Sequence, residues 1–322
     1  MGARKWSQVM LFCVAACGSD DAGSAPAGTT AESTPPTTTG VPSNVDSTST
    51  PNPTTTGSDT ADAADSSGGP AGNPLISDAQ LNIAHRGGAL LAPEETLVAF
   101  ETATAAGADV LEFDVHLSAD GVVICSHDDT VDRMTDGTGA ISDMTLDELQ
   151  QLDAGYSFTT DDGATYPYRG MGVVLPTMAE VLAAHPDGYF VIEIKQSEPP
   201  MVDEVLDLLD QADAASRVIM ASFETPVIED LRSKAPDILT SFTTTEVTDF
   251  VIGGGDADYV PPGDFLQIPT IIWSEATRVN AAMHGLKIHV WTINDPAEME
   301  ALLSDGADGI MTDDPATLAT LQ

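Results

Sequence analysis

From about residue 75 to the C-terminus, short apolar runs alternate with segments of helical character, and this alternation is the feature that most constrains the fold. The predicted strands are 82–85, 110–115, 122–125, 189–195, 217–222, 238–242, 265–268, 287–293 and 309–311. The predicted helices are 95–106, 145–152, 177–184, 201–212, 226–234, 275–284, 296–303 and 315–321. Many of the strands are apolar on both faces, which is typical of parallel strands covered by helices. The pattern favours an α/β fold, a (β/α)8 TIM barrel over 75–322, rather than an open doubly wound sheet. No G-x-G-x-x-G turn follows the first strand, so a dinucleotide-binding fold lacks its main support.

The first 17 residues resemble an export signal. Arg4 and Lys5 precede a short apolar run that ends in small residues before Cys17. The run is too short to span a bilayer, and Val14-Ala15-Ala16-Cys17 resembles a bacterial lipobox. We therefore expect residues 1–17 to be a lipoprotein signal peptide that leaves the protein exported and lipid-anchored to the cell envelope at Cys17. The alternative is an ordinary secretory signal, with Cys17 incidental.

Residues 18–74 are dominated by Ser, Thr, Pro, Gly, Ala and Asp and show no apolar periodicity. Such a composition buries too little apolar area to offset chain entropy, so the segment is predicted to be a disordered linker. The linker contains seven acids, which leaves 44 acids and 9 bases for the predicted domain at 75–322.

The chain has 11 Lys and Arg against 51 Asp and Glu, a formal net charge of −40. This balance excludes nucleic acid as a partner, because backbone recognition needs clustered bases. An anionic membrane surface is disfavoured for the same reason, so the lipid anchor is the only membrane contact expected. The surplus acid suggests solubility in a salty or exposed setting. Within the predicted domain the single cysteine, Cys125, lies in an apolar run and is interpreted as a core residue.

In a barrel of this kind, functional residues lie at the carboxyl ends of the strands. Glu112 and Asp114 are two residues apart on a predicted strand, so they share a face, and Glu193 from another strand is placed to meet them. Three hard oxygen donors suit Mg²⁺ or Ca²⁺ better than Zn²⁺. The competing interpretation is a solvated strand end in an acidic chain, and the spacing alone does not decide between the two.

Bases are scarce, so their positions are informative. Arg86 follows a histidine at the end of the first strand, and Lys195 lies two residues after Glu193, which together suggest a clamp for phosphate. His85 and His127 are candidates for an acid and a base near neutral pH. We interpret the other four histidines as surface or core residues, with His116 the most ambiguous: His116, His185, His284 and His289.

Seven motifs in order resemble the glycerophosphodiester phosphodiesterases. They are His85-Arg86-Gly87-Gly88, Pro93-Glu94-Glu95-Thr96, Glu112-Phe113-Asp114-Val115, Ser126-His127-Asp128 with Asp132-Arg133 and Thr135, Glu193-Ile194-Lys195, Val290-Trp291-Thr292-Ile293-Asn294, and the run from Gly306 to Pro315. The resemblance covers about residues 81–321. It implies a (β/α)8 barrel with one divalent metal ion, Ca²⁺ or Mg²⁺.

The resemblance also implies roles for single residues. The metal ligands would be Glu112, Asp114 and Glu193. The acid/base pair would be His85 and His127, and Arg86 and Lys195 would bind the phosphate. Glu94 would support these residues, and Trp291, with Phe223, would line the glycerol side. Glu95 departs from the Asn that is common in the family at this position, and we interpret it as tuning rather than loss of activity.

The resemblance implies metal-dependent hydrolysis of small glycerophosphodiesters to sn-glycerol 3-phosphate and an alcohol. One alternative is a phospholipase D-type enzyme that acts on lysophospholipid or sphingolipid, favoured if the segment 156–174 forms an inserted loop with an apolar groove over the barrel mouth. A second alternative is a catalytically silent surface-binding module. The intact set of inferred site residues argues against it.

Overall fold

The computed structural model describes residues 72–322 of the chain. The predicted signal peptide and all but the last residues of the predicted linker therefore lie outside the described residues. Asn73 accepts a hydrogen bond from the backbone N–H of Leu75 at the start of a 3-10 turn, η1 (Pro74–Ile76). Leu75 is fully buried, so packing begins next to the predicted boundary at 75.

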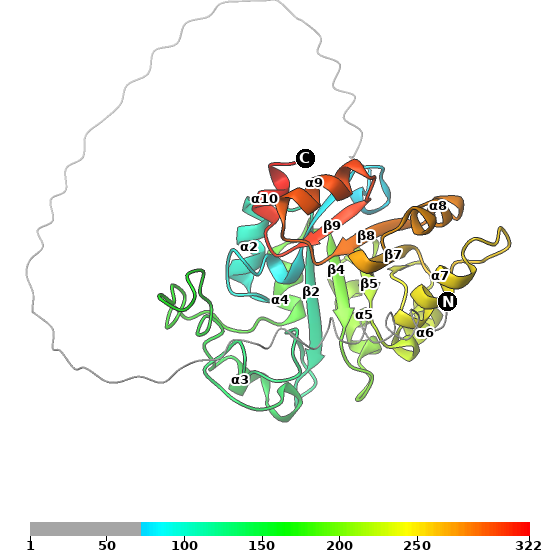
Figure 1. Ribbon diagram of the computed structural model, residues 1–322. Helices are drawn as coiled ribbons and strands as arrows, with labels where there is room; N and C mark the ends of the chain where they lie inside the picture. Colours follow the sequence, from blue (N-terminus) through cyan, green and yellow to red (C-terminus); the bar gives the residue numbers. More distant parts are fainter. Residues whose placement is uncertain (1–71) are drawn as a thin grey trace, which may run out of the picture. The chain divides into compact units, whose positions relative to one another are not determined.

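Eight parallel strands form the barrel (Figure 1). They are β1 (Leu81–Ala84), β2 (Val110–Leu117), β4 (Phe190–Ile194), β5 (Val218–Ala221), β6 (Leu239–Thr240), β7 (Phe265–Pro269), β8 (Lys287–Trp291) and β9 (Gly309–Thr312). Their order is β6-β5-β4-β2-β1-β9-β8-β7. A parallel bridge between Ser241 and Phe265 joins the two ends of this path, so the sheet closes on itself. The predicted (β/α)8 fold is confirmed.

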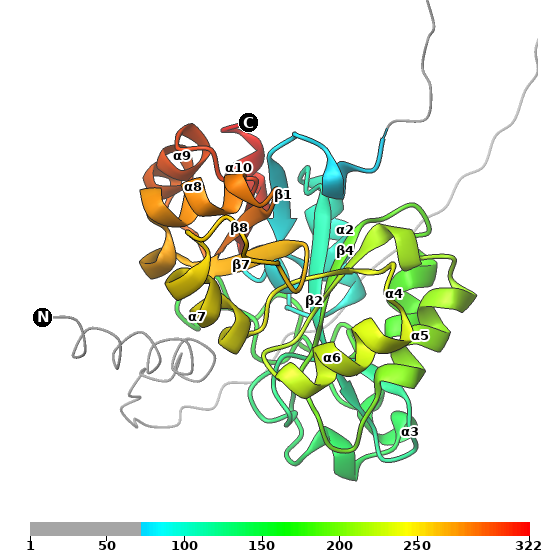
Figure 2. The same ribbon diagram turned by 90° about the vertical axis from the view of Figure 1, so that its right-hand side faces the viewer.

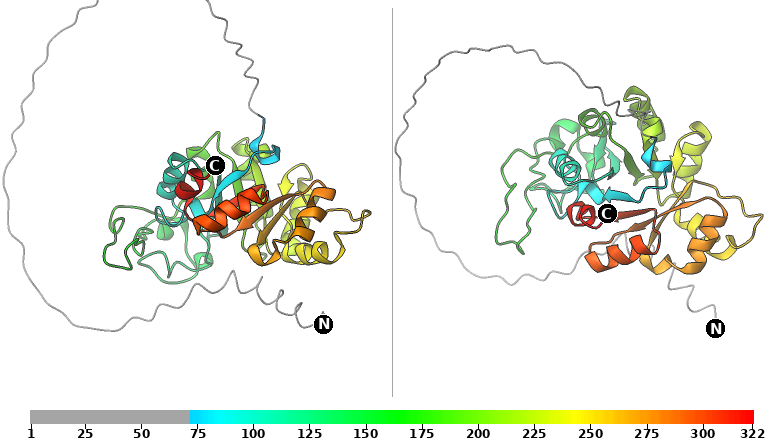
Figure 3. Two further views of the ribbon diagram at one scale, coloured as in Figure 1. Left: turned by 45° about the horizontal axis from the view of Figure 1, so that its top comes forward. Right: turned by 90° about the horizontal axis from the view of Figure 1, so that it is seen from above.

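A helix follows each barrel strand. These helices are α2 (Leu97–Ala105), α4 (Met178–Ala184), α5 (Val202–Gln211), α6 (Thr225–Lys234), α7 (Thr244–Gly253), α8 (Glu275–Met283), α9 (Pro296–Ser304) and α10 (Pro315–Ala319). Figures 2 and 3 show them on the outside of the strands. None of the helices in residues 72–322 has the length and apolarity needed to cross a bilayer.

Local sequence sets several helix starts. Thr177 and Thr243 begin α4 and α7 with capping boxes, in which a glutamate three residues later returns a hydrogen bond to the capping residue. The helix α7 was not predicted, because its Thr- and Val-rich sequence is equally typical of a strand. The capping-box spacing of Thr243 and Glu246 is the sequence signal that indicates this helix.

The predicted strand 122–125 is not part of the barrel. Its counterpart β3 (Val123–Cys125) pairs antiparallel with β2 and forms a hairpin. The chain then makes an excursion that contains η3 (Ile141–Asp143) and the short helix α3 (Leu146–Leu149) before it returns at α4 (Figure 1). A periodic apolar pattern is the same for a hairpin strand and a barrel strand, so sequence did not separate them.

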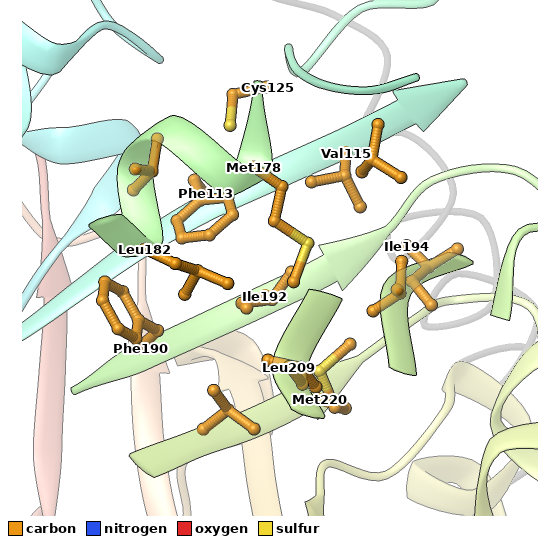
Figure 4. Packing of buried hydrophobic residues seen from close by; sticks show 14 of the residues in the cluster. Phe113, Val115, Cys125, Met178, Leu182, Phe190, Ile192, Ile194, Leu209 and Met220 are labelled. Atoms are coloured by element: carbon orange, nitrogen blue, oxygen red, sulfur yellow. The ribbon is translucent and has the colours of Figure 1, made fainter. Parts of the chain in front are cut away.

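Strand residues alternate between two apolar environments. Phe113, Phe190 and Ile192 face outward and pack under α4 and α5 together with Cys125, which is fully buried as predicted (Figure 4). The opposite positions face the barrel interior. Many of these interior positions are apolar and pack with Leu75 into a second cluster, formed by Leu81, Ile83, Val110, Val191, Ile219, Ala221, Phe265 and Met311. Further along β2 and β4 the same interior series becomes charged.

His289 lies inside the barrel and is fully buried. Its Nδ1 is 3.4 Å from Nε2 of Gln267, and its Nε2 has no hydrogen-bond partner among the described residues. Burial, with the charge of Lys287, lowers the pKa of His289 from 6.5 to about 3. The imidazole is therefore neutral in the folded protein, whereas the unfolded chain takes up a proton below pH 6.5.

This difference predicts that His289 makes folding stability fall as the pH drops from about 6.5 toward 3. Each pH unit below the unfolded pKa costs about 1.4 kcal/mol, so the contribution lost between pH 7 and pH 4 is about 3 kcal/mol. Urea unfolding of wild type and His289→Gln at both pH values measures it. The variant should lose less stability on acidification, and equal losses in the two proteins would contradict the prediction.

Candidate active site

A left-handed turn places His85 and Arg86 directly after β1. The 3-10 turn η2 (His85–Gly87) is followed by Gly88, and the φ angles of Arg86, Gly87 and Gly88 are 51°, 78° and 85°. A Cβ on Gly87 would lie 2.7 Å from the Phe100 ring. Glycine is therefore required there by both backbone conformation and space. This explains the two glycines that follow His85 and Arg86 in the sequence.

Three carboxylates from β2 and β4 meet at the carboxyl end of the barrel. Glu112 and Asp114 lie on the interior face of β2, and Glu193 is opposite Asp114 in the parallel pairing. Glu112 is 4% exposed and Asp114 1%. The interpretation as a solvated strand end is therefore wrong. Lys195 places its Nζ 3.3 Å from Oδ1 of Asp114 and 3.2 Å from Oε1 of Glu193, as expected for a base among these acids.

Burial of so many acids shifts their proton affinities. Burial and the charge of Asp114 raise the pKa of Glu112 to about 7. Burial raises the pKa of Glu193 to about 8, although Lys195 opposes the shift. Burial alone would also raise the pKa of Asp114, but Lys195 and the nearby histidines and arginine hold it below its usual range. Glu112 and Glu193 therefore hold protons more readily near neutral pH than exposed glutamates do.

The donor chemistry of these residues fits a hard cation, since all three are carboxylates. Both carboxylate oxygens of Asp114 are buried and accept no hydrogen bond from a described residue. Within residues 72–322, however, no group of three His, Cys, Asp or Glu side chains is arranged so that it could hold a metal ion. The Lys195 ammonium is the cation that contacts Asp114 and Glu193.

His85 is held by the end of the last strand. Its Nδ1 lies 2.6 Å from Oδ1 of Asp313, and Asn294 donates a 2.7 Å hydrogen bond to Oδ2 of the same carboxylate. Burial lowers the pKa of His85, but the hydrogen bond to Asp313 and the charge of Glu112 outweigh it, so the pKa is raised. The fixed Nδ1 leaves Nε2 as the ring nitrogen for chemistry.

His127 is held in a similar way by a different element. It follows the hairpin strand β3, and not a barrel strand as expected, and its Nδ1 is 2.8 Å from Oδ1 of Asp128. His116 places its Nε2 3.3 Å from the His127 carbonyl oxygen. His116 thus belongs to the surroundings of the site, which resolves its ambiguity. The two candidate histidines each pair with a carboxylate at the same ring nitrogen.

Arg86 contacts two glutamates of the site, Glu112 through its backbone and Glu94 through its side chain. Its backbone N–H donates a 2.7 Å hydrogen bond to Oε2 of Glu112, and its Nη1 lies 3.1 Å from Oε1 of Glu94. Its Nε is buried and donates no hydrogen bond to a described residue. Glu94 therefore supports Arg86 as expected.

Two aromatic side chains stand next to Lys195. The Phe223 and Trp291 rings pack edge to face with centroids 6.1 Å apart, and the Lys195 Nζ is 5.9 Å from the Phe223 ring centre. Trp291 ends β8. The structure thus brings Phe223 and Trp291 together beside one of the predicted phosphate ligands.

Comparison with known proteins identifies this arrangement. The Glycerophosphoryl diester phosphodiesterase family model matches residues 85–317. A glycerophosphodiester phosphodiesterase from Caldanaerobacter subterraneus subsp. tengcongensis is 33% identical over 250 residues, which are 75% of this chain and 97% of that protein. The chain belongs to the glycerophosphoryl diester phosphodiesterase family. It is an enzyme of the phosphodiesterase class, which confirms the resemblance noted in the sequence.

Solved structures of family members agree with the fold. A glycerophosphodiester phosphodiesterase from Agrobacterium tumefaciens superposes with a TM-score of 0.64 at 27% identity, covering 75% of this chain and 99% of that one. An Oleispira antarctica phosphodiesterase, solved with the product sn-glycerol-3-phosphate, gives 0.62 at 25% identity, covering 74% of this chain and 95% of that one.

Glu95, the departure from the common family motif, has a defined structural role. Its Oε1 accepts a 3.2 Å hydrogen bond from the backbone N–H of Asp114. The pairing of β2 with β1 ends before this residue, at Leu111. The residue is buried in a left-handed conformation with φ 59°, and its Oε2 has no partner among the described residues. Burial and the charges of Asp114 and Glu112 raise the pKa of Glu95 well above its usual range.

The segment 156–174 is a compact loop on the excursion after β3. Arg169 lies between the Tyr156 and Tyr166 rings, 4.0 and 3.7 Å from their centres. Ser157 and Gly170 bond to Met134 and Asp153 of the same excursion. Its influence on substrate choice stays a prediction.

Sequence reasoning assigned no role to several polar residues that hold the site together: Asp128, Arg133, Asn294 and Asp313. All four belong to the quoted family motifs. Asp313 directly follows β9, so the rule that functional residues lie at the carboxyl ends of barrel strands was the signal for it.

Proposed function

We propose that this phosphodiesterase hydrolyses glycerophosphodiesters to sn-glycerol 3-phosphate and an alcohol. The observation that carries the proposal is the pair of imidazoles, His85 and His127, each bonded through Nδ1 to a carboxylate in a site that also contains two partly buried cations. Relatives named glycerophosphodiester phosphodiesterase, and the sn-glycerol-3-phosphate bound to the Oleispira antarctica protein, support the choice of substrate and product.

The two histidines perform the proton transfers. One accepts the proton of the attacking oxygen as that oxygen bonds to phosphorus, and the other protonates the departing alkoxide as its P–O bond breaks. Asp313 and Asp128 keep the tautomers that present Nε2. Because one proton is taken up and one is given, a single displacement leaves the pair in exchanged protonation states. Proton exchange with solvent restores the pair after attack by water, and hydrolysis of the cyclic phosphate restores it after attack by the substrate's own hydroxyl. The attacking oxygen is that of water or of the substrate's own glycerol.

Arg86 and Lys195 bind the phosphate and offset the charge that develops on its oxygens. Glu112, Asp114 and Glu193 would hold the divalent cation, Ca²⁺ or Mg²⁺, once their carboxylates move closer together than they lie in this structure, where Lys195 contacts two of them. When bound, the cation would supply the positive charge that the acids of this cluster lack, and it would polarise the phosphoryl oxygen. Phe223 and Trp291 line the side of the site that receives the glycerol.

Replacing either histidine tests the proton-transfer roles. Loss of a general acid or base typically costs about 10²–10⁴-fold, so His85→Ala and His127→Ala should each lower kcat on glycerophosphocholine by that factor. His185→Ala, at the residue that directly follows α4 outside the site, serves as the control. Thermal melts check that all three fold. Wild-type turnover in either site variant would refute the assignment.

A substrate and metal panel tests the activity itself. With Ca²⁺ or Mg²⁺ the enzyme should release sn-glycerol 3-phosphate from glycerophosphocholine, and a chelator should abolish the release. Release of choline from lysophosphatidylcholine, with glycerophosphocholine left intact, would favour the phospholipase D-type alternative.

In calorimetry, Glu112→Gln should bind the ion at least about tenfold more weakly, since even residues behind metal ligands contribute that much. The exposed Glu101→Gln should match wild type.

We also propose that the enzyme is exported and held at the cell envelope through a lipid on Cys17. The supporting observation is the small-small-Cys end of the predicted signal. In a bacterial host, the full chain should partition into detergent, whereas Cys17→Ser should remain in the aqueous phase. Cys13→Ser, in the same segment, should behave as wild type. Aqueous partitioning of the wild-type chain would indicate a secreted protein.

A further inference from the structure

Arg133 contacts two carboxylates of the site, those of Asp128 and Glu94. Its Nε donates a 2.6 Å hydrogen bond to Oδ2 of Asp128, and its Nη2 donates one of the same length to Oε1 of Glu94. Its Nη1 lies 3.1 Å from Sδ of Met134. Each of its three nitrogens therefore has a partner within the chain, unlike the buried Nε of Arg86.

Each of these two carboxylates also serves a residue of the proposed mechanism. Asp128 uses Oδ1 for His127 Nδ1 and Oδ2 for Arg133, so one planar group links the imidazole to the guanidinium. Glu94 uses a single oxygen, Oε1, for both Arg86 and Arg133. The contact with Arg133 is the shorter, at 2.6 Å against 3.1 Å.

From this continuous chain of contacts, we propose that Arg133 is a positioning residue that sets the orientation of His127 and the effective charge of Arg86 at the same time. The proposal rests on the function proposed above. Through Asp128, Arg133 fixes the imidazole plane. Through Glu94, it shares a carboxylate that would otherwise neutralise Arg86 alone, and so it preserves positive charge for the phosphate.

The stability of the domain depends little on the Arg133 side chain. The Arg133 side chain is 44% exposed, and exposed ion pairs contribute little to stability. The surrounding loop has other anchors, including a backbone bridge between Thr130 and Ala140 and the bond from Ser126 Oγ to the Asp128 carbonyl. Arg133→Met should therefore fold.

The test separates the two effects by kinetics on glycerophosphocholine. Arg133→Met should lower kcat about 10- to 100-fold, the usual cost of losing a residue that orients a catalytic group. It should also weaken competitive inhibition by sn-glycerol 3-phosphate. Asp128→Asn should lower kcat and leave that inhibition near wild type. The double variant should have a kcat close to that of Asp128→Asn, because both changes break the same link to His127.

Two further variants complete the design. Arg278→Met removes an arginine of similar exposure that pairs with Asp305 away from the site, and should match wild type. Arg133→Lys, which can donate to both carboxylates only from a single nitrogen, should recover part of kcat or part of the product affinity. It carries the test if thermal melts show that Arg133→Met does not fold.

Wild-type kcat and product inhibition in Arg133→Met would overturn the proposal, as would losses that multiply fully in the double variant. Failure of the proposed function gives a different result, because wild type would then release no sn-glycerol 3-phosphate from glycerophosphocholine, and failure of the histidine role would leave turnover in His127→Ala. An inactive His127→Ala beside an unaffected Arg133→Met would reject the positioning role alone.

Discussion

The candidate active site depends on the burial of four acidic side chains at the carboxyl end of the barrel, around β2 and β4. Glu95, Glu112, Asp114 and Glu193 lie close together, and each would be costly to bury without compensation. The chain compensates in part with Lys195 and with Arg86, which are among the few bases it has. A cation bound here would offset the cost of ionising the glutamates whose pKa values burial raises, and hydrogen bonds to Asp313 and Asp128 hold the two histidines beside them.

The fold was predictable because its two periodicities are encoded locally. Alternation along the strand made Glu112 and Asp114 neighbours on one face and placed the apolar Leu111, Phe113 and Val115 on the outward face. The long excursion after β3 was not predictable, since its hairpin strand has the same pattern as a barrel strand. The helix α7 was missed because its residues favour strand and helix alike, and only its cap distinguishes them.

The candidate site was predictable as a set of residues but not as a network. Motifs identify His85, His127 and their acids, and the structure brings them to one end of the barrel. The partners at 128, 133, 294 and 313 follow from distances between segments far apart in the chain. The spacing of residues in the sequence does not show that two arginines share one oxygen of Glu94. That detail requires the folded positions of both.

The junction between β6 and β7, where the barrel closes, affects where local opening of the sheet can begin. β6 has only two residues, and a single bridge, with the bonds around it, connects that strand to β7. In the strand order this junction lies at the far side of the ring from β1 and β2. Breathing motions that begin at the thinnest pairing therefore start as far as possible from the residues that must hold a fixed geometry. Local opening at this junction would leave the pairing of β1 with β2, beside the turn that holds His85 and Arg86, in place.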